Sequence, residues 1–198
     1  MKKMMKFAGV AALALALSQT LQATTISGNI GFTGGAVLNG SSAANATGVT
    51  SWISPVVNLV SGSFATIPTT PSPTVPVTFA APWSFNSGAS PFWTVTYGGE
   101  TFTFNLLASS ITAQGGTPGV SGFVIVNGTG TVSGSGNITY APTAMSWSFT
   151  SQDPAVTHGP ETFTFSASAS AIPDGASTAM LLGLALSSVA LLKRKFMA

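Results

Sequence analysis

The chain has 198 residues with six basic and four acidic side chains, and it contains no cysteine. All of the basic residues lie close to the two ends, at Lys2, Lys3, Lys6, Lys193, Arg194 and Lys195. The long stretch between them therefore cannot neutralise phosphates, which excludes nucleic acid as a partner. The lack of cysteine excludes thiolate catalysis and cysteine-ligated metal sites.

The N-terminal residues 1–23 have the order of parts of a secretory signal. Three lysines precede an apolar run over residues 7–17, and Ala23 is a small residue at which signal peptidase can cut. An N-terminal membrane anchor or a core helix is the alternative, but this apolar run is too short to span a bilayer. We therefore expect a signal helix that is removed on export.

Residues 24–171 have the composition of a sheet protein. Helix-forming charged residues and glutamine are scarce, whereas threonine, valine and aromatic residues, which favour a pleated surface, are abundant. Residues 123–126 are continuously apolar, which is typical of a strand covered on both faces. Apolar residues alternate with small or polar ones, as in a strand with one buried face, over residues 26–32, 75–79, 92–97, 101–106, 147–149 and 162–165.

Turn signals separate these runs. They occur at Gly34-Gly35, Asn39-Gly40, Gly98-Gly99, Gly115-Gly116, Asn127-Gly128 and His158-Gly159-Pro160. The proline-rich residues 68–76 predict an extended loop or a sheet edge, because proline cannot donate a hydrogen bond to a central ladder. With about ten candidate strands, the sequence predicts an all-β domain, either an antiparallel β-sandwich or a jelly-roll-like fold.

The predicted core consists of the apolar residues on one face of these strands. They are Ile30, Phe32, Phe79, Phe102, Phe104, Ile125, Trp147, Phe149, Phe163 and Phe165. Two pairs of phrases also resemble each other, residues 83–85 with 100–104 and residues 147–149 with 161–165. They indicate either a duplicated strand pair in equivalent sheet positions or a coincidence in a chain biased toward Thr, Phe and Ser.

The inventory of reactive side chains predicts no enzyme. His158, the single histidine, lies in a turn-like stretch near Asp153 and Glu161 without a G-x-S-x-G elbow, so a surface histidine is favoured over a catalytic triad. Glu100 and Glu161 are the natural pair for a glycosidase, but each follows turn residues at a strand start, where a glutamate is normally solvated. Asp153, Glu161 and Asp174 lack the spacing of a calcium loop. We expect no metal and no cofactor.

The aromatic residues have two possible roles, in the core or as a platform for a sugar ring. Trp83 and Trp147 lie in alternating runs with phenylalanine and are predicted to be core residues. Trp93 follows Phe92 directly, and neighbours on a strand face opposite ways. Trp93 is therefore the best candidate for an exposed, sugar-stacking side chain.

Residues 172–198 differ in character from the domain before them. Residues 172–178 form a short motif, Ile172, Pro173, Asp174, Gly175, Ala176, Ser177 and Thr178. The apolar run over residues 176–192 measures about 26 Å as a helix, at the short end for a transmembrane span. The basic cluster of Lys193, Arg194 and Lys195 after it predicts that this end is cytoplasmic and that the domain lies outside.

This order of proline-containing motif, apolar helix and basic end resembles the PEP-CTERM sorting signal, particularly its VPDSG variant. Ile172 stands where that variant usually has valine, and Ala176 where it has serine or glycine. The resemblance covers about the last 27 residues. It implies recognition by an exosortase, a membrane-embedded transpeptidase-like enzyme that removes the tail.

Together these features predict an exported protein with an inner-membrane intermediate, delivered to the cell surface or to an extracellular matrix such as that of a biofilm. The favoured role is structural or adhesive and non-enzymatic. The alternative is a carbohydrate-binding module whose partner is exopolysaccharide, and an exposed row of aromatic side chains would favour it.

Overall fold

The structure is a computed structural model that describes residues 24–69, 73–153 and 163–171. Its elements are β1 (Thr24–Thr25), β2 (Asn29–Leu38), β3 (Gly48–Val60), the 3-10 turn η1 (Gly62–Phe64), β4 (Val77–Phe79), β5 (Trp83–Ser84), β6 (Ala89–Tyr97), β7 (Glu100–Gly115), β8 (Phe123–Ser135), β9 (Tyr140–Gln152) and β10 (Phe163–Ala171). The predicted all-β class and the number of strands are confirmed. Within the described ranges, no helix is long and apolar enough to cross a membrane.

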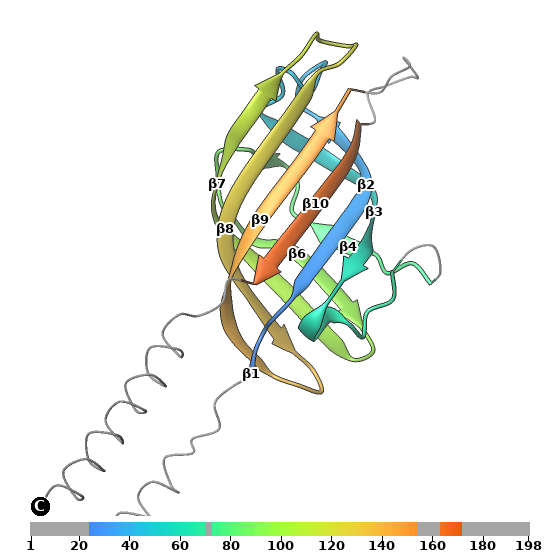
Figure 1. The fold of residues 1–198 in the computed structure, drawn as a ribbon, viewed down its shortest axis with the longest axis vertical. Helices are drawn as coiled ribbons and strands as arrows, with labels where there is room; N and C mark the ends of the chain where they lie inside the picture. The colour runs from blue at the N-terminus through green and yellow to red at the C-terminus, as the bar shows by residue number, and fades with distance from the viewer. Residues whose placement is uncertain (1–23, 70–72, 154–162, 172–198) are drawn as a thin grey trace, which may run out of the picture.

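The strands form one hydrogen-bonded path that folds over into two facing layers, a β-sandwich-like fold. The order along the path is β4-β6-β7-β8-β9-β10-β2-β3-β5. In Figure 1 the strands from β7 to β10, together with β2, form the nearer layer, and β6 lies behind them. Strands β6 to β10 are neighbours in chain order, whereas a jelly roll is built from two Greek keys. The jelly-roll alternative is therefore wrong.

The two ends of this path approach each other, which closes the core on that side. The amide of Val57 donates to the carbonyl of Val75 at 3.0 Å, and the indole of Trp52 donates to the carbonyl of Ala80 at 2.8 Å. Pro76 makes a single bridge to Val56. The prediction of an extended loop or a sheet edge is thus confirmed for the described residues of the proline-rich stretch.

Regular alternation directs the apolar side chains of β7, β8 and β9 into the space between the layers. The buried residues on these strands are Phe102, Phe104 and Leu106, then Val124, Val126 and Val132, then Met145, Trp147 and Phe149. Rings from opposite layers meet there, with Phe32 and Trp93 5.1 Å apart and Phe92 and Trp147 5.0 Å apart between centroids. Aromatic pairs at such distances stabilise a core beyond the area that they bury.

The predicted core is confirmed at seven positions and wrong at one. Ile125 is half-buried on the opposite face of β8, because Val124 and Val126 hold the inward positions on either side of it. The expectation of a strand covered on both faces is likewise wrong for residues 123–126. Phe163 and Phe165 lie on β10, but their side chains are outside the described part of the chain.

The glycine pairs differ in what they do. Gly98 and Gly99 form the two-residue turn between β6 and β7, and both have positive φ, as a tight hairpin turn requires. Gly34-Gly35 and Asn127-Gly128 lie inside β2 and β8, so the predicted turns are wrong there. A Cβ on Gly128 would lie 2.6 Å from the carbonyl oxygen of Ala108, where the pairing of β7 and β8 shifts register. Close strand approach, not a turn, requires this glycine.

The repeated phrases do not occupy equivalent places. Trp83 lies on the two-residue strand β5 at one end of the path, and Trp147 lies in the middle of β9. Coincidence in a biased composition is therefore favoured for the described phrases.

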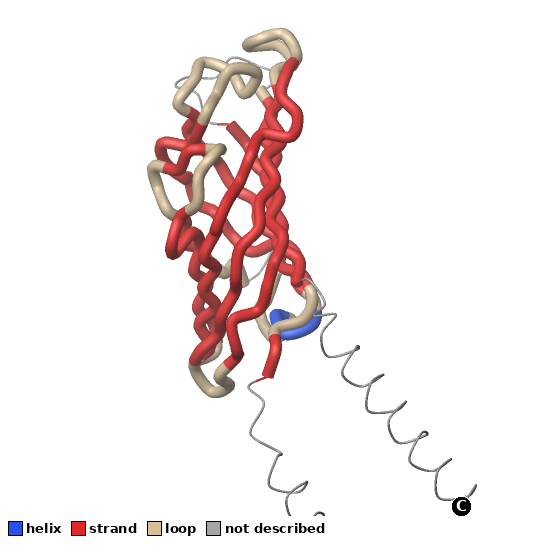
Figure 2. The backbone as a smooth tube through the Cα atoms, turned by 90° about the vertical axis from the view of Figure 1, so that its left-hand side faces the viewer, coloured by secondary structure: helices blue, strands red, loops and turns tan. Residues whose placement is uncertain are grey.

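The chain enters and leaves the domain at the same end. Thr24 of β1 pairs with Tyr140 in parallel, and Ala171 of β10 pairs with Met145, so both lie beside the first part of β9. We call this the terminal end. The opposite end, formed by the loops over residues 39–47 and 116–122 and by Asp153, is the loop end, at the top of Figures 1 and 2. The predicted signal and tail, residues 1–23 and 172–198, lie outside the described residues.

Candidate functional site

Trp93 is buried, so its predicted role as an exposed sugar-stacking residue is wrong. Phe92 and Trp93 are both fully buried, although neighbours on a regular strand face opposite ways. The pairing of β6 with β7 is irregular between Ala89 and Trp93, and this irregularity lets both rings turn inward. Trp93 stacks on Phe104 with 5.5 Å between ring centroids. It therefore has no free face for a sugar.

The prediction of a core position is confirmed for Trp83 and Trp147. Trp83 and Trp147 are buried in the core, and Trp52 packs against it from the edge. Of the aromatic side chains that the structure describes, that of Tyr97 alone is exposed, at 40 %. The aromatic residues of these strands thus serve mainly to hold the two layers together.

A pocket at the terminal end combines aromatic and polar groups, and we call it the tyrosine pocket. It has a volume of about 260 Å³. Typical ligand pockets measure about 300–1,000 Å³, so this one has room for a small ligand. Its lining comes from η1 and the turn after it, from the β6–β7 hairpin, from the β8–β9 loop and from the start of β9. The residues are Ser63, Thr66, Tyr97, Gly98, Glu100, Phe102, Asn137, Ile138 and Tyr140.

Glu100 is the one carboxylate in the lining of this pocket, and one of its two oxygens has no hydrogen-bond partner among the described residues. Its Oε1 accepts a hydrogen bond from the amide of Ile138 at 2.8 Å, which fixes the β8–β9 loop. Its Oε2 is buried and has no hydrogen-bond partner among the described residues. An unpartnered buried acceptor is costly, and a ligand hydroxyl or ammonium could satisfy it after a local movement. The expectation that Glu100 is simply solvated is wrong.

Sequence analysis missed this pocket because its parts come from separate turns. Asn137 Nδ2 donates to the carbonyl of Gly98 at 3.1 Å and so joins the β8–β9 loop to the β6–β7 turn. Tyr140 lies against Phe102, with 5.7 Å between ring centroids. The turn signal at Gly98-Gly99 placed Glu100 at a strand start, but no local pattern shows which loop covers it.

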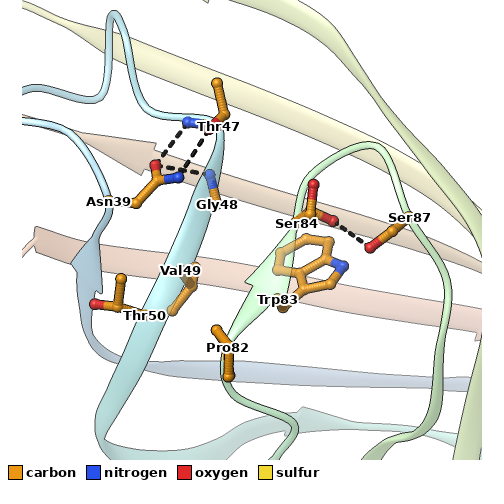
Figure 3. Close-up of a pocket in the computed structure, with 9 residues that line it drawn as sticks. All are labelled: Asn39, Thr47, Gly48, Val49, Thr50, Pro82, Trp83, Ser84 and Ser87. Atoms are coloured by element: carbon orange, nitrogen blue, oxygen red, sulfur yellow. Dashed lines mark hydrogen bonds between the residues drawn. The ribbon is translucent and has the colours of Figure 1, made fainter.

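A second pocket, of about 350 Å³, lies between β3 and β5 (Figure 3). Its lining is uncharged and consists of Asn39, Thr47, Gly48, Val49, Thr50, Pro82, Trp83, Ser84 and Ser87. The Asn39 side chain closes the loop between β2 and β3. Its Oδ1 accepts hydrogen bonds from the amides of Thr47 and Gly48 at 2.8 and 3.0 Å, and its Nδ2 donates to the Thr47 hydroxyl at 2.8 Å. The Asn39 side chain of this pocket thus already has hydrogen-bond partners within the fold.

Asp153 ties together the loop end. Its carboxylate accepts four hydrogen bonds of 2.7–3.2 Å, from the Ser42 hydroxyl and from the amides of Ala43, Gly119 and Gly122. Partial burial acts to raise the pKa of Asp153, but these donors outweigh it and lower the pKa below its usual value. The carboxylate therefore closes two loops onto the end of β9 and has a structural role.

Most of the remaining predicted site residues lie outside the described part of the chain. The described ranges hold no cluster of three or more His, Cys, Asp or Glu residues that could bind a metal. His158 and Glu161 lie outside the described residues, as do the sorting motif of residues 172–178 and the basic cluster of residues 193–195. Their roles stay predictions.

Comparisons with known proteins give no match to this chain, whether the search is made against family models, curated proteins or solved structures.

Proposed function

We propose that this protein is exported and acts at the cell surface or in the extracellular matrix in a structural or adhesive, non-enzymatic role. In this proposal signal peptidase removes residues 1–23. The apolar run over residues 176–192 then holds the protein in the inner membrane until an exosortase acts on the motif of residues 172–178. These steps rest on the order of charges, apolar runs and motif in the sequence.

The observation that carries the proposal is the position of the two chain ends. Thr24 and Ala171 both lie beside the start of β9, at the terminal end. A domain whose signal and anchor attach at one end can remain at a membrane while its other end projects outward. The arrangement supports anchoring at a membrane, because both attachment points lie at the same end of the sheet.

The outer faces of the strands support an adhesive role. Opposite the buried face of β7, hydroxyl groups lie in rows across neighbouring strands, with Thr103 paired to Thr94 on one side and to Ser133 on the other. Thr96 and Thr101 bond each other at 3.0 Å. Such a surface offers many uncharged donors and acceptors to a polysaccharide or to a second protein.

Intact mass spectrometry of the mature protein tests the proposal. The expected mass lacks residues 1–23 and the residues beyond about Gly175. Cells without an exosortase are the control, and there the protein should keep its tail. Recovery of the full-length chain from exosortase-competent cells would contradict the proposal.

Carbohydrate binding is a second candidate, favoured by the tyrosine pocket. Tyr97 offers an exposed ring, and the buried Oε2 of Glu100 is an acceptor without a partner. A glycan array on the tail-less mature protein tests this function. Tyr97→Ala should abolish the signal, while the control Leu107→Ala, an exposed residue outside the pocket, should retain it. Equal signals from both variants would rule out the pocket as the site.

A further inference from the structure

The terminal end carries exposed apolar side chains from three different elements. Ile138, on the β8–β9 loop, is 47 % exposed, Tyr97 at the end of β6 is 40 % exposed, and Leu59 near the end of β3 is 57 % exposed. The one carboxylate described at this end, Glu100, has one oxygen bonded to the Ile138 amide and the other buried. The described part of this end thus presents apolar and hydroxyl groups and little charge.

The length of the connecting segment fixes where this end lies. Under the proposed function, residues 176–192 span the membrane, and the present inference rests on that anchor. Ala171, the last described residue, is five Cα-to-Cα steps from Ala176, which reach at most about 18 Å when fully extended. The headgroup layer on one side of a bilayer is itself about 5–8 Å thick. The terminal end is therefore held close against the membrane.

We infer that the terminal end docks on the outward leaflet of the membrane while the tail is anchored, with Ile138 and Tyr97 among the lipid headgroups. Tyrosine is enriched at membrane interfaces, because its ring is apolar and its hydroxyl stays hydrated. The apolar side chain of Ile138, which lines the same pocket as Tyr97, is removed from water by this contact. The tyrosine pocket faces the lipid in this state and is uncovered when the tail is removed.

The contact is apolar in origin. Membrane-binding proteins that use electrostatics carry clusters of lysine and arginine, and this chain has neither between residues 7 and 192. We therefore expect the docked state to be independent of salt concentration and of the anionic lipid content of the membrane.

Fluorescence quenching on the full chain tests the inference. The chain lacks cysteine, so the variants Ile138→Cys and Tyr97→Cys each accept a single environment-sensitive label. Val120→Cys is the matched control, because Val120 is 70 % exposed at the loop end, about 40 Å away along β8. The labelled proteins are reconstituted in phosphatidylcholine vesicles that contain a headgroup-attached nitroxide quencher. Circular dichroism checks that each variant keeps its sheet.

The expected result is several-fold stronger quenching at positions 138 and 97 than at 120, unchanged at high salt. Equal, weak quenching at all three positions on protein that floats with the vesicles would overturn the docking and leave the proposed anchor intact. Strong quenching at position 120 as well, or loss of quenching at high salt, would also overturn it. Protein that fails to float with the vesicles would overturn both the anchor and the docking.

Discussion

Phe104 and Thr103 are neighbours on β7 that face opposite sides of the sheet. Phe104 is fully buried, stacks on Trp93 and lies across Gly130, where a Cβ would meet its ring at 2.7 Å. Phe104→Ala should therefore lower the free energy of unfolding by about 3–5 kcal/mol, through lost burial and a residual cavity. Thr103→Ala should cost within about 0.5 kcal/mol, because Thr103 lies on the outer face.

Chemical unfolding monitored by tryptophan fluorescence measures this contrast. Equal small losses at both positions would contradict the buried position of Phe104. Equal large losses would mean that the outer face of β7 is covered in solution, which the hydroxyl rows do not predict.

Asp153 makes the loop end sensitive to acid. Its folded pKa lies below the ordinary value of about 3.9, so its bonds stabilise the fold fully above that value. This contribution disappears as the pH falls through the lower folded pKa. Asp153→Asn removes the charge from four hydrogen bonds and should cost about 1–3 kcal/mol at neutral pH.

Unfolding of both proteins across a pH series checks this expectation. The difference between wild type and Asp153→Asn should narrow below about pH 4 and close at still lower pH. A difference that stays constant across the series would contradict a role for the carboxylate charge.

Residue positions were predictable from the sequence where alternation is regular and not where pairing is irregular. Phe102 and Phe104 follow the simple period of two on β7, and both are buried as predicted. Trp93 departs from that period at the irregularity between β6 and β7, which depends on the partner strand. Local sequence carries no signal for a neighbour that pairs from elsewhere in the chain.

At the scale of elements, β10 holds the sheet together although it is the last strand in the chain. It pairs with β2 over eight residues and with β9 over eight residues. Removal of residues 163–171 would leave both neighbours with unpaired ladders facing the gap. The shortened chain should lose its cooperative unfolding transition.

Deletion of β1 is the matched control for this prediction. β1 makes two residue pairs with β9, so a chain that starts after Thr25 should keep most of its stability. Far-UV circular dichroism with thermal unfolding compares the two truncations. A cooperative transition without β10 would show that β9 and β2 can pair directly.

At the scale of elements, the turn signals misplaced some strand limits, because Asn127-Gly128 lies inside β8. β7 has 16 residues and β8 has 13, and glycines lie inside β8 where the neighbouring strand leaves no room for a Cβ. At Gly128 the obstacle is the carbonyl of Ala108, and at Gly130 it is the ring of Phe104 together with the backbone of β7. Glycine is a signal both for a turn and for close strand approach. Composition alone does not separate the two.

At the scale of the whole molecule, the domain and the C-terminus at Ala198 should lie on opposite sides of the membrane. A reporter inserted at Gly116, in an exposed loop at the loop end, should be active only outside the cytoplasm. In cells that lack the sorting enzyme, a reporter fused after Ala198 should be active only inside it. Activity of the Gly116 fusion in the cytoplasm would contradict export.

Neutral replacements of Lys193, Arg194 and Lys195 test the anchor itself. These residues are the basic cluster after the apolar run, so their loss should weaken retention in the membrane fraction. Unchanged retention would show that the apolar run alone suffices.

The sequence predicted an all-β domain and most of its strands. It did not predict how the sheet closes or that the two ends of the chain lie at the same end of the domain. These depend on which strands pair, and β10 pairs with β2 across more than 120 residues of chain. The tyrosine pocket likewise draws on separate parts of the sequence, because η1, β6, β7, the β8–β9 loop and β9 all contribute to its lining.

The central place of β10 also decides how the protein bears force. A protein held through Ala171 and gripping a partner at the loop end is pulled along the axis of β10, which runs between those two ends. The ladders to β2 and β9 are then loaded in shear, so their hydrogen bonds resist together instead of opening one pair at a time. The tension is therefore applied to an inner strand, and its two neighbours, β2 and β9, share the load. An edge strand would have one neighbour and could separate from it one hydrogen bond at a time.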